Sequence, residues 1–224
     1  MQTSLIFKLL RSLNPMTDRR VLLATKNQGK LKEFLRIITE LHGENSLELL
    51  SADDFPDLGD IEETGATFIE NALLKARESC RITGVAAIAD DSGICVDALN
   101  GMPGIYSARW AGSHGNDRAN LELLLAQLSH VPIDRRTGSF RCAVALVFPD
   151  GRELVEEGVM PGYIIDQPRG SGGFGYDPIF VAEGHEVTTA ELSPSDKDAI
   201  SHRGKAFRAL APRLLASLES HNFS

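Results

Sequence analysis

The sequence is poor in cysteine and has no long apolar run. Its three cysteines, Cys80, Cys95 and Cys142, are scattered and show no metal-ligand spacing. An odd number of isolated cysteines argues against a disulfide framework and against a zinc site, and it predicts reduced thiols in a cytoplasmic protein. No stretch approaches the roughly 20 apolar residues of a membrane span. We therefore expect neither a disulfide scaffold nor a membrane-bound protein.

The sequence also lacks an excess of basic residues. Lys and Arg number 23 and Asp and Glu number 31, which gives a formal net charge of −8. Binding to nucleic acid requires a basic surface, so we expect no nucleic-acid partner. A nucleotide substrate remains compatible with this charge, because a local group of lysines and arginines is enough to bind its phosphates. Hydrophobic residues make up 42% of the chain, enough for a sizeable core.

The first 19 residues contain a short apolar patch, Leu5–Phe7. They show neither the basic start nor the small-residue cleavage site of a signal peptide. We expect a disordered extension over residues 1–19, or a start codon placed too early with Met16 as the alternative start. Residues 20–219 are then expected to form a single two-lobed domain, a length that suits one domain.

Strand and helix patterns alternate along this domain. A buried strand is expected at 21–24, and helical spacing follows in Leu31, Phe34, Leu35 and Ile38. The Asp-Gly of Pro149–Arg152 separates two strand-like runs and is a hairpin signal. Further strands are expected at 47–50, 86–89, 140–148, 153–159 and 179–182, and helices at about 67–81, 116–128 and 196–218, the last kinked or restarted at Pro212. The mixture predicts an α/β fold, with helices flanking a mixed β-sheet.

The turn after the first strand carries groups that suit an anion. It consists of Thr25, Lys26, Asn27, Gln28, Gly29 and Lys30. Backbone N–H groups at a helix start favour anions, and Lys30 adds positive charge. The turn is not a P-loop, because Ala24 stands where the first glycine belongs and Leu31 replaces the Ser or Thr. The alternative is that Asn27 only caps the helix.

Two acidic pairs, Glu62-Glu63 and Asp90-Asp91, are candidates for metal binding. Mg²⁺ takes oxygen ligands, commonly one or two carboxylates with water and substrate phosphate. Asp90-Asp91 follows a buried strand, and ligands gather at strand ends in α/β sheets. A carboxylate there can also accept a proton from an attacking water. The alternatives are a solvated acidic loop for the first pair and a plain turn for Asp90-Asp91-Ser92-Gly93.

A glycine-rich segment near the C-terminus, Gly170–Asp177, combines two aromatic rings with an acid. We call it the glycine turn. Its four glycines remove side chains and let a ligand approach the backbone closely. A flat base could stack on Phe174 while its polar edge meets Asp177. The alternative is that Phe174 and Tyr176 are core aromatics beside a tight turn.

Three further basic groups could serve the same ligand. Lys75 lies on the second expected helix, and Lys197 precedes the pair His202-Arg203 by five and six residues. Facing one cleft, these side chains could neutralise a polyphosphate and read a base. Charged runs of this kind are otherwise ordinary helix surface.

Taken together, the motifs resemble the inosine/xanthosine triphosphate pyrophosphatase family, and within it the bacterial branch. The matching segments occur in the order of that family and span about residues 20–215. They are Thr25–Lys30, Glu62–Phe68 with Glu70–Ala72, Ala89–Gly93, Pro103–Arg109, Gly172–Pro178, and Ala190–Leu192 through Ser201–Gly204. The departures are small, since Lys26 replaces a frequent glycine and the first twenty residues have no counterpart.

The resemblance implies an enzyme that hydrolyses ITP, dITP and XTP between the α- and β-phosphates, and so clears non-standard purines from the nucleotide pool. It also implies a homodimer with a long cleft between two lobes. Residues 25–30 and Lys75 would bind phosphate, and Ser92 would contact substrate. Glu62 and Asp91 would hold Mg²⁺, with Glu63 as a substitute for Glu62, and Asp91 would accept the proton, helped by Asp90. The nucleoside would be bound by Phe174, Gly175, Tyr176, Asp177, Lys197, His202 and Arg203.

The purine selectivity has a simple physical expectation. Inosine and xanthosine carry a 6-oxo acceptor where adenine carries a 6-amino donor. Arg203, or backbone N–H groups near it, would donate to the oxo form only, and an unmatched buried donor costs about 1–3 kcal/mol. Two other functions remain to be separated from this one by experiment, a P-loop-type kinase or NTPase and a catalytically silent nucleotide-binding module.

Overall fold

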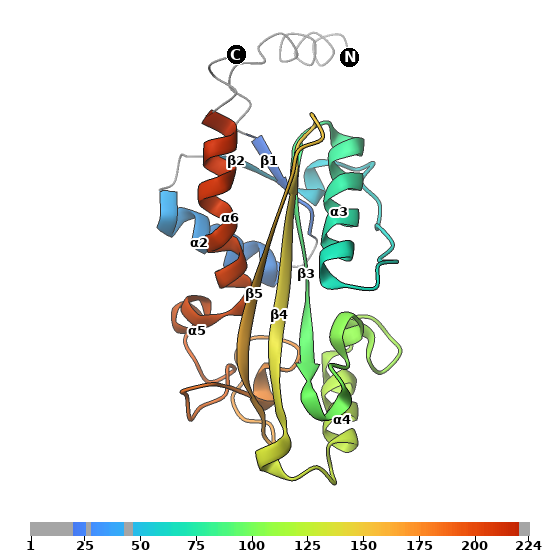
Figure 1. Ribbon diagram of the computed structural model, residues 1–224, viewed down its shortest axis with the longest axis vertical. Helices are drawn as coiled ribbons and strands as arrows, with labels where there is room; N and C mark the ends of the chain where they lie inside the picture. The colour runs from blue at the N-terminus through green and yellow to red at the C-terminus, as the bar shows by residue number, and fades with distance from the viewer. Residues whose placement is uncertain (1–19, 26–27, 43–46, 220–224) are drawn as a thin grey trace.

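The computed structural model describes residues 20–25, 28–42 and 47–219, and its elements follow the expected alternation (Figure 1). The strands are β1 (Arg20–Leu23), β2 (Glu48–Ser51), β3 (Ala86–Val96), β4 (Thr137–Val147), β5 (Glu153–Ile164) and β6 (Phe180–Ala182). The helices are α2 (Gln28–His42), α3 (Phe68–Thr83), α4 (Asp117–Gln127), α5 (Pro194–Ile200) and α6 (His202–Glu219). The expected extension over residues 1–19 lies outside the described residues.

The strands form one mixed sheet in the order β2-β1-β3-β4-β5-β6. β1 is parallel to β2 and β3, and the other pairs are antiparallel. Helices α2 and α6 cover one face of the sheet and α3 covers the other, while α4 lies toward the opposite end of the long strands (Figure 1). The predicted α/β fold with a mixed sheet flanked by helices is confirmed.

Three apolar clusters lie along the long strands, one under α2 and α6, one under α3 and one at the α4 end. At the α2–α6 end, Phe34 and Phe207 pack against Val144 and Leu146 of β4. At the α4 end, Leu124 packs with Phe140 of β4. Because β3, β4 and β5 run through both regions, the two ends of the molecule are built on the same strands.

Strand β3 is longer than the sequence pattern suggested. It was expected to end at Asp90-Asp91, yet its ladder with β4 runs from Ala87↔Val147 to Val96↔Gly138. Its pairing with β1 covers only Ala86–Ile88. Asp90 and Asp91 are therefore interior strand residues rather than a turn, and β3 has lost its β1 neighbour at the point where they occur.

The C-terminal helical region divides at Ser201 and not at Pro212. Ser201 has an extended backbone conformation, with φ −62° and ψ 148°, and it separates α5 from α6. Its hydroxyl accepts a hydrogen bond from the Gly204 N–H at 2.8 Å, as a helix-capping side chain does. Pro212 lies within α6 on its exposed side. In α2, the helical spacing predicted Leu35 on the buried face, yet Leu35 is 42% exposed. Ile37 is buried in the core instead.

The predicted hairpin joins β4 to β5, and Gly151 adopts the positive φ of 88° that favours glycine in such turns.

Across the described ranges, none of the helices combines the length and apolar character needed to cross a bilayer.

Candidate active site

A cleft of about 1030 Å³ collects most of the residues singled out by the sequence. It lies where β3 extends beyond β1, and its lining comes from both ends of the molecule. The predicted residues that line it are Thr25, Gly29, Lys30, Glu62, Glu63, Lys75, Asp91, Ser92, Phe174, Gly175, Tyr176, Asp177, Lys197, His202 and Arg203. Lys26 and Asn27 lie outside the described residues, and Gln28 begins α2 without a described side chain.

One end of the cleft pairs carboxylates with cations. Lys75 of α3 lies 2.5 Å from a carboxylate oxygen of Glu63 and 4.0 Å from one of Asp91. Arg109 lies 3.5 Å from the other oxygen of Glu63. Burial raises the pKa of Asp91 above its usual value, although the Lys75 ammonium opposes this. Burial would lower the pKa of Lys75, but Asp91, Asp90 and Glu63 outweigh it and keep the ammonium charged.

Asp90 belongs to a different network on the opposite face of β3, because successive strand residues point to opposite sides. Its carboxylate lies 2.9 Å from Lys30 Nζ and 3.2 Å from Arg203 Nε. Burial would raise the pKa of Asp90, but Lys30 and Arg203 hold it far below its usual range. Asp90 thus remains ionised and paired, which makes it a poor acceptor for a proton.

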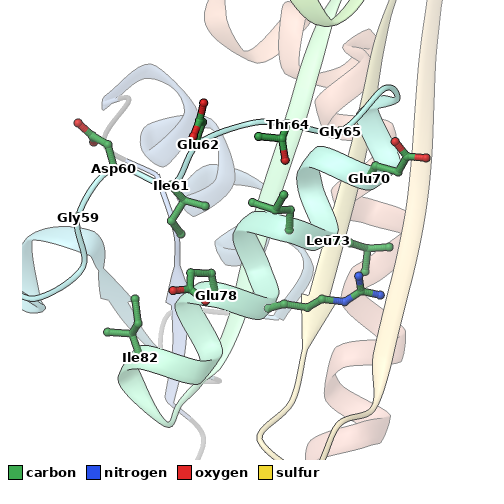
Figure 2. A pocket seen from close by; sticks show the side chains of 12 residues that line it. Gly59, Asp60, Ile61, Glu62, Thr64, Gly65, Glu70, Leu73, Glu78 and Ile82 are labelled. Carbon is green, nitrogen blue, oxygen red and sulfur yellow. The ribbon is translucent and has the colours of Figure 1, made fainter.

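The acidic loop, residues 59–66, separates this cleft from a second hollow of about 810 Å³ beside α3. Figure 2 shows Ile61 and Glu62 pointing to opposite sides of the loop. Glu62 is exposed, whereas Glu63 is partly buried against Lys75. The described residues that line the second hollow include no lysine. Its arginine, Arg77, is bound to Glu153 by two hydrogen bonds at its rim.

The glycine turn forms the other end of the cleft. The ring of Phe174 is 40% exposed, with Lys197 Nζ 5.0 Å from its centroid. Asp177 is buried and accepts hydrogen bonds from Phe174 N–H at 2.8 Å, from Thr189 Oγ1 at 2.8 Å and from Lys197. Asp177 therefore shapes the turn and leaves the Phe174 ring available to a ligand.

Tyr176 and Arg203, two of the predicted nucleoside-binding residues, are buried. The Tyr176 hydroxyl donates to the Ser107 carbonyl at 2.8 Å, and its ring belongs to the core. Arg203 is 2% exposed and already donates to Glu33, Asp90 and Ser92. These contacts use three of the five N–H groups of Arg203, and its guanidinium lies 5.7 Å from the centroid of the Phe174 ring. Donation from Arg203 to a 6-oxo group stays a prediction.

His202 has a different environment. Its ring stacks on Phe140, with centroids 5.0 Å apart and planes at 15°. Burial, together with the charges of Arg203 and Lys197, holds the pKa of His202 well below its usual value. Within the described part of the chain, its Nδ1 atom is buried without a hydrogen-bond partner. A neutral imidazole with an unsatisfied nitrogen thus lies at the base of the Phe174 end.

Sequence reasoning assigned no role to several residues that build the site: Glu33, Asn71, Arg109 and Asp117. Glu33 and Lys30 lie three residues apart on α2, so they occupy the same helix face. Glu33 could have been found from the sequence, because it is a charged residue on the side of the helix that faces the core. Arg109 closes the Pro103–Arg109 segment, whose position in the fold the sequence did not give. Asn71 pairs with the Gly65 N–H six residues away and with the Asp91 carboxylate, and Asp117 accepts from the Gly175 N–H across 58 residues.

The chain is similar to known proteins over most of its length. Residues 21–213 match the model of the Ham1 family. A dITP/XTP pyrophosphatase of Streptomyces coelicolor is 54% identical over 193 residues, which cover 86% of this chain and 96% of that protein. A dITP/XTP pyrophosphatase of Nocardia farcinica is 54% identical over 201 residues, which cover 90% of this chain and 97% of that protein.

Solved structures give the same answer. The crystal structure of the nucleoside-triphosphatase / dITP/XTP pyrophosphatase from Mycobacterium abscessus has a TM-score of 0.71 at 52% identity, over 87% of this chain and 98% of that one. The Staphylococcus aureus Ham1 protein has a TM-score of 0.76 at 40% identity, over 90% and 98%. The motifs, the fold and the family match coincide, and the chain belongs to the Ham1 family.

Proposed function

We propose that this protein hydrolyses ITP, dITP and XTP to the nucleoside monophosphate and pyrophosphate with the help of Mg²⁺. One observation carries the proposal. A single cleft has the Lys75–Glu63–Asp91 group at one end and the exposed Phe174 ring beside Lys197 at the other. A purine nucleoside triphosphate has matching ends, a flat base and a polyanion. The names of the related pyrophosphatases support the same reaction.

The donor set fits Mg²⁺ bound together with substrate. Glu63 and Asp91 both present carboxylates near Lys75, and Glu62 lies on the same loop but is exposed. Within the described ranges there is no group of three or more His, Cys, Asp or Glu side chains suited to a metal. Mg²⁺ commonly takes one or two carboxylates and completes its shell with water and phosphate oxygens. When bound, the ion would polarise the phosphoryl group and offset its charge.

The chain's own residues divide the remaining work. Lys30, Lys75 and Arg109 would hold the triphosphate by charge and fix the α-phosphorus for attack. Asp91, whose pKa burial raises, would accept the proton of the attacking water as the O–P bond forms. The pyrophosphate then leaves as the bond to the α-phosphorus breaks. Asp90, paired with Lys30 and Arg203, would hold those cations in place and not take the proton.

Base recognition would combine stacking on Phe174 with donors from Lys197 and His202. Stacking of a base on an aromatic ring contributes about 1–3 kcal/mol and is tolerant of the base. Selectivity then requires a donor that meets the 6-oxo group. A neutral His202 can donate from one ring nitrogen, and its Nδ1 is unsatisfied in the described structure. Arg203 would contribute indirectly, through the groups that it orders.

Incubation of the purified protein with ITP and Mg²⁺ tests the proposal. Release of pyrophosphate and IMP is expected, with little turnover of ATP. Orthophosphate as the product would favour the kinase-like or NTPase reading, and ITP binding without turnover would favour a silent binding module. A homodimer and a cytoplasmic location are further expectations from the resemblance, and sedimentation of the purified protein tests the first.

A further inference from the structure

Asn71, on the first turns of α3, is a buried amide with no solvent exposure. It lies between the two acidic segments of the cleft, the acidic loop and strand β3. Buried amides are retained at a cost unless their polar atoms are paired. Both polar atoms of Asn71 are paired, and each pairs with a different one of those segments.

The direction of these hydrogen bonds is fixed by chemistry. The Gly65 N–H donates to Asn71 Oδ1 at 2.8 Å, and a backbone N–H can act only as a donor. The other amide atom must then be Nδ2, which donates to Asp91 Oδ2 at 3.0 Å. The ambiguity that usually accompanies amide side chains is therefore absent. Asp91 Oδ1 is held separately by the N–H of Ser92 at 2.9 Å.

Gly65 shows how closely the loop rests on this amide. A Cβ atom at position 65 would lie 2.7 Å from Asn71 Oδ1, which is too close for any real side chain. The close approach requires glycine at position 65 and brings the loop backbone within hydrogen-bonding distance of Asn71 on α3. Glu63 lies two residues before this contact, so the tether at Gly65 limits where its carboxylate can reach.

One face of α3 therefore organises the acidic centre. Asn71 and Lys75 are four residues apart and lie on the same side of the helix. Lys75 pairs with Glu63 and approaches Asp91, while Asn71 binds the backbone near Glu63 and the Asp91 carboxylate directly. The two side chains connect the same two acids by different means, one by charge and one by directed hydrogen bonds.

We infer that Asn71 is a positioning residue that sets the distance and orientation between Glu63 and Asp91 for the pyrophosphatase reaction. The inference rests on the proposed function, in which these carboxylates serve the reacting phosphate. Partners of this kind, which orient groups at a reacting centre, change activity or metal affinity by about 10- to 100-fold when removed.

Asn71→Leu tests the inference because it keeps the branched shape and the number of side-chain heavy atoms and removes both hydrogen bonds. We expect kcat for ITP to fall by about 10- to 100-fold, with KM changing less than about threefold. The Mg²⁺ concentration for half-maximal rate should rise by at least about threefold. Amide hydrogen exchange, measured on the metal-free protein over residues 60–67, should accelerate at Gly65. Asn71→Ser, whose hydroxyl can still serve one partner, should recover part of kcat.

Two controls separate positioning from stability. Glu70 accepts from the Ala66 N–H of the same loop at 2.6 Å but has no contact with Asp91, so Glu70→Ala should keep kcat within about threefold. Asn120 is 1% exposed and bridges Ala111 N–H and the Ala108 carbonyl, so Asn120→Leu calibrates the loss of Tm from removing a buried amide.

The outcomes are distinct. A folded Asn71→Leu protein with wild-type kcat and Mg²⁺ dependence would overturn the inference, as would an equal loss of kcat in Glu70→Ala. Should Asn71→Leu fail to fold, Asn71→Ser decides, and a wild-type kcat and Gly65 exchange rate there would count against positioning. A wild-type protein that releases no pyrophosphate refutes the proposed function instead, and unchanged Gly65 exchange in the variant would then still refute the tether.

Discussion

Asp90 and Asp91 are consecutive buried residues whose charged partners differ, and this difference decides which of them can take a proton. Asp91 faces α3, where burial raises its pKa and an amide and a lysine approach it. Asp90 faces α2 and α6, where Lys30 and Arg203 keep it ionised. A base must bind a proton during turnover, and a structural carboxylate must not. The alternation of side chains along β3 assigns these two tasks to neighbours.

Replacement of Asp91 by Asn is expected to lower kcat for ITP by about 10²- to 10⁴-fold, the usual contribution of a general base. The variant should stay folded, because an amide oxygen can still accept the Asn71 hydrogen bond. Pyrophosphate release and the thermal unfolding midpoint, measured on the same sample, check both parts. Activity within a few-fold of wild type would remove Asp91 from the mechanism.

Asp90→Asn is the matched neighbour and should fail differently. It leaves Lys30 and Arg203 without their shared carboxylate, and breaking a buried ion pair costs about 3–5 kcal/mol. The expected result is therefore a large loss in the free energy of unfolding, measured with urea. A fully stable but inactive variant would point to a direct role of Asp90 in the chemistry.

His202 makes stability depend on pH. Burial, then Arg203 and Lys197, lower its pKa from the ordinary value of 6.5, so the folded protein keeps this imidazole neutral. Below that value the unfolded chain gains a proton that the folded chain refuses, and the free energy of unfolding falls. The loss from this residue should be about 1.4 kcal/mol between about pH 7.5 and about pH 5.5.

Urea unfolding of wild type and His202→Gln at both pH values measures this contribution. The variant should lose less stability on acidification by that amount. Parallel pH dependences in the two proteins would show that His202 titrates normally when folded.

At the scale of elements, local sequence patterns predicted which strands and helices exist better than they predicted where each one ends. The apolar run at 86–89 predicted strand β3, but the carboxylates of Asp90 and Asp91 directly after it suggested that the strand ends there. They can stay in the strand because Lys30, Lys75 and Arg203 reach them from three different helices. No local rule contains those partners. The same reasoning explains Glu33, a buried charge on α2 whose partner Arg203 lies on α6.

The C-terminal helices show a second limit of local reasoning. Pro212 predicted a kink or a new helix start at that position, yet the helix runs through Pro212 and the break between α5 and α6 lies at Ser201. Ser201 donates to Glu33 and accepts from Gly204, so tertiary and local hydrogen bonds favour the break there. The glycine turn, in contrast, could be recognised from its composition, and the Phe174 ring that it exposes was the side chain expected to meet a base.

Helix α4 anchors the glycine turn, and this contact makes a prediction. The Gly175 N–H donates to Asp117 Oδ2 at 2.8 Å across 58 residues of sequence. Asp117→Ala should loosen the Phe174 ring and raise KM for ITP by about tenfold, the equivalent of one hydrogen bond to a charged group. The value of kcat should change less than about twofold, because the phosphate end is untouched. Steady-state kinetics with ITP provides the measurement.

Asp117→Asn keeps an acceptor and should restore most of the affinity. Glu122→Ala removes only an exposed ion pair with Arg118 on the same helix and should leave KM unchanged. An equal rise of KM in Glu122→Ala would attribute the effect to α4 in general and not to the Gly175 contact.

At the scale of the whole molecule, three long strands carry both ends of the cleft. Strand β4 contributes Phe140 to the apolar cluster at the α4 end and Leu146 to the cluster under α2 and α6, so the base end and the phosphate end are parts of one packed sheet (Figure 1). The cleft opens where β1 stops pairing with β3. A substrate that spans the cleft should therefore gain binding energy from two sites held at a fixed distance. The contribution of each site can be measured with a substrate that occupies only one of them.

Inorganic tripolyphosphate fills only the phosphate end and should be hydrolysed with a kcat/KM at least about 100-fold below that of ITP, because base stacking and its hydrogen bonds contribute about 3 kcal/mol or more. Phe174→Ala should lower kcat/KM for ITP by about 5- to 100-fold and leave the tripolyphosphate value unchanged. Lys75→Ala should lower both, since Lys75 lies at the phosphate end with Glu63. A Phe174→Ala protein that loses activity on tripolyphosphate as well would mean that the aromatic ring supports the catalytic end, and the division of the cleft into two sites would be wrong.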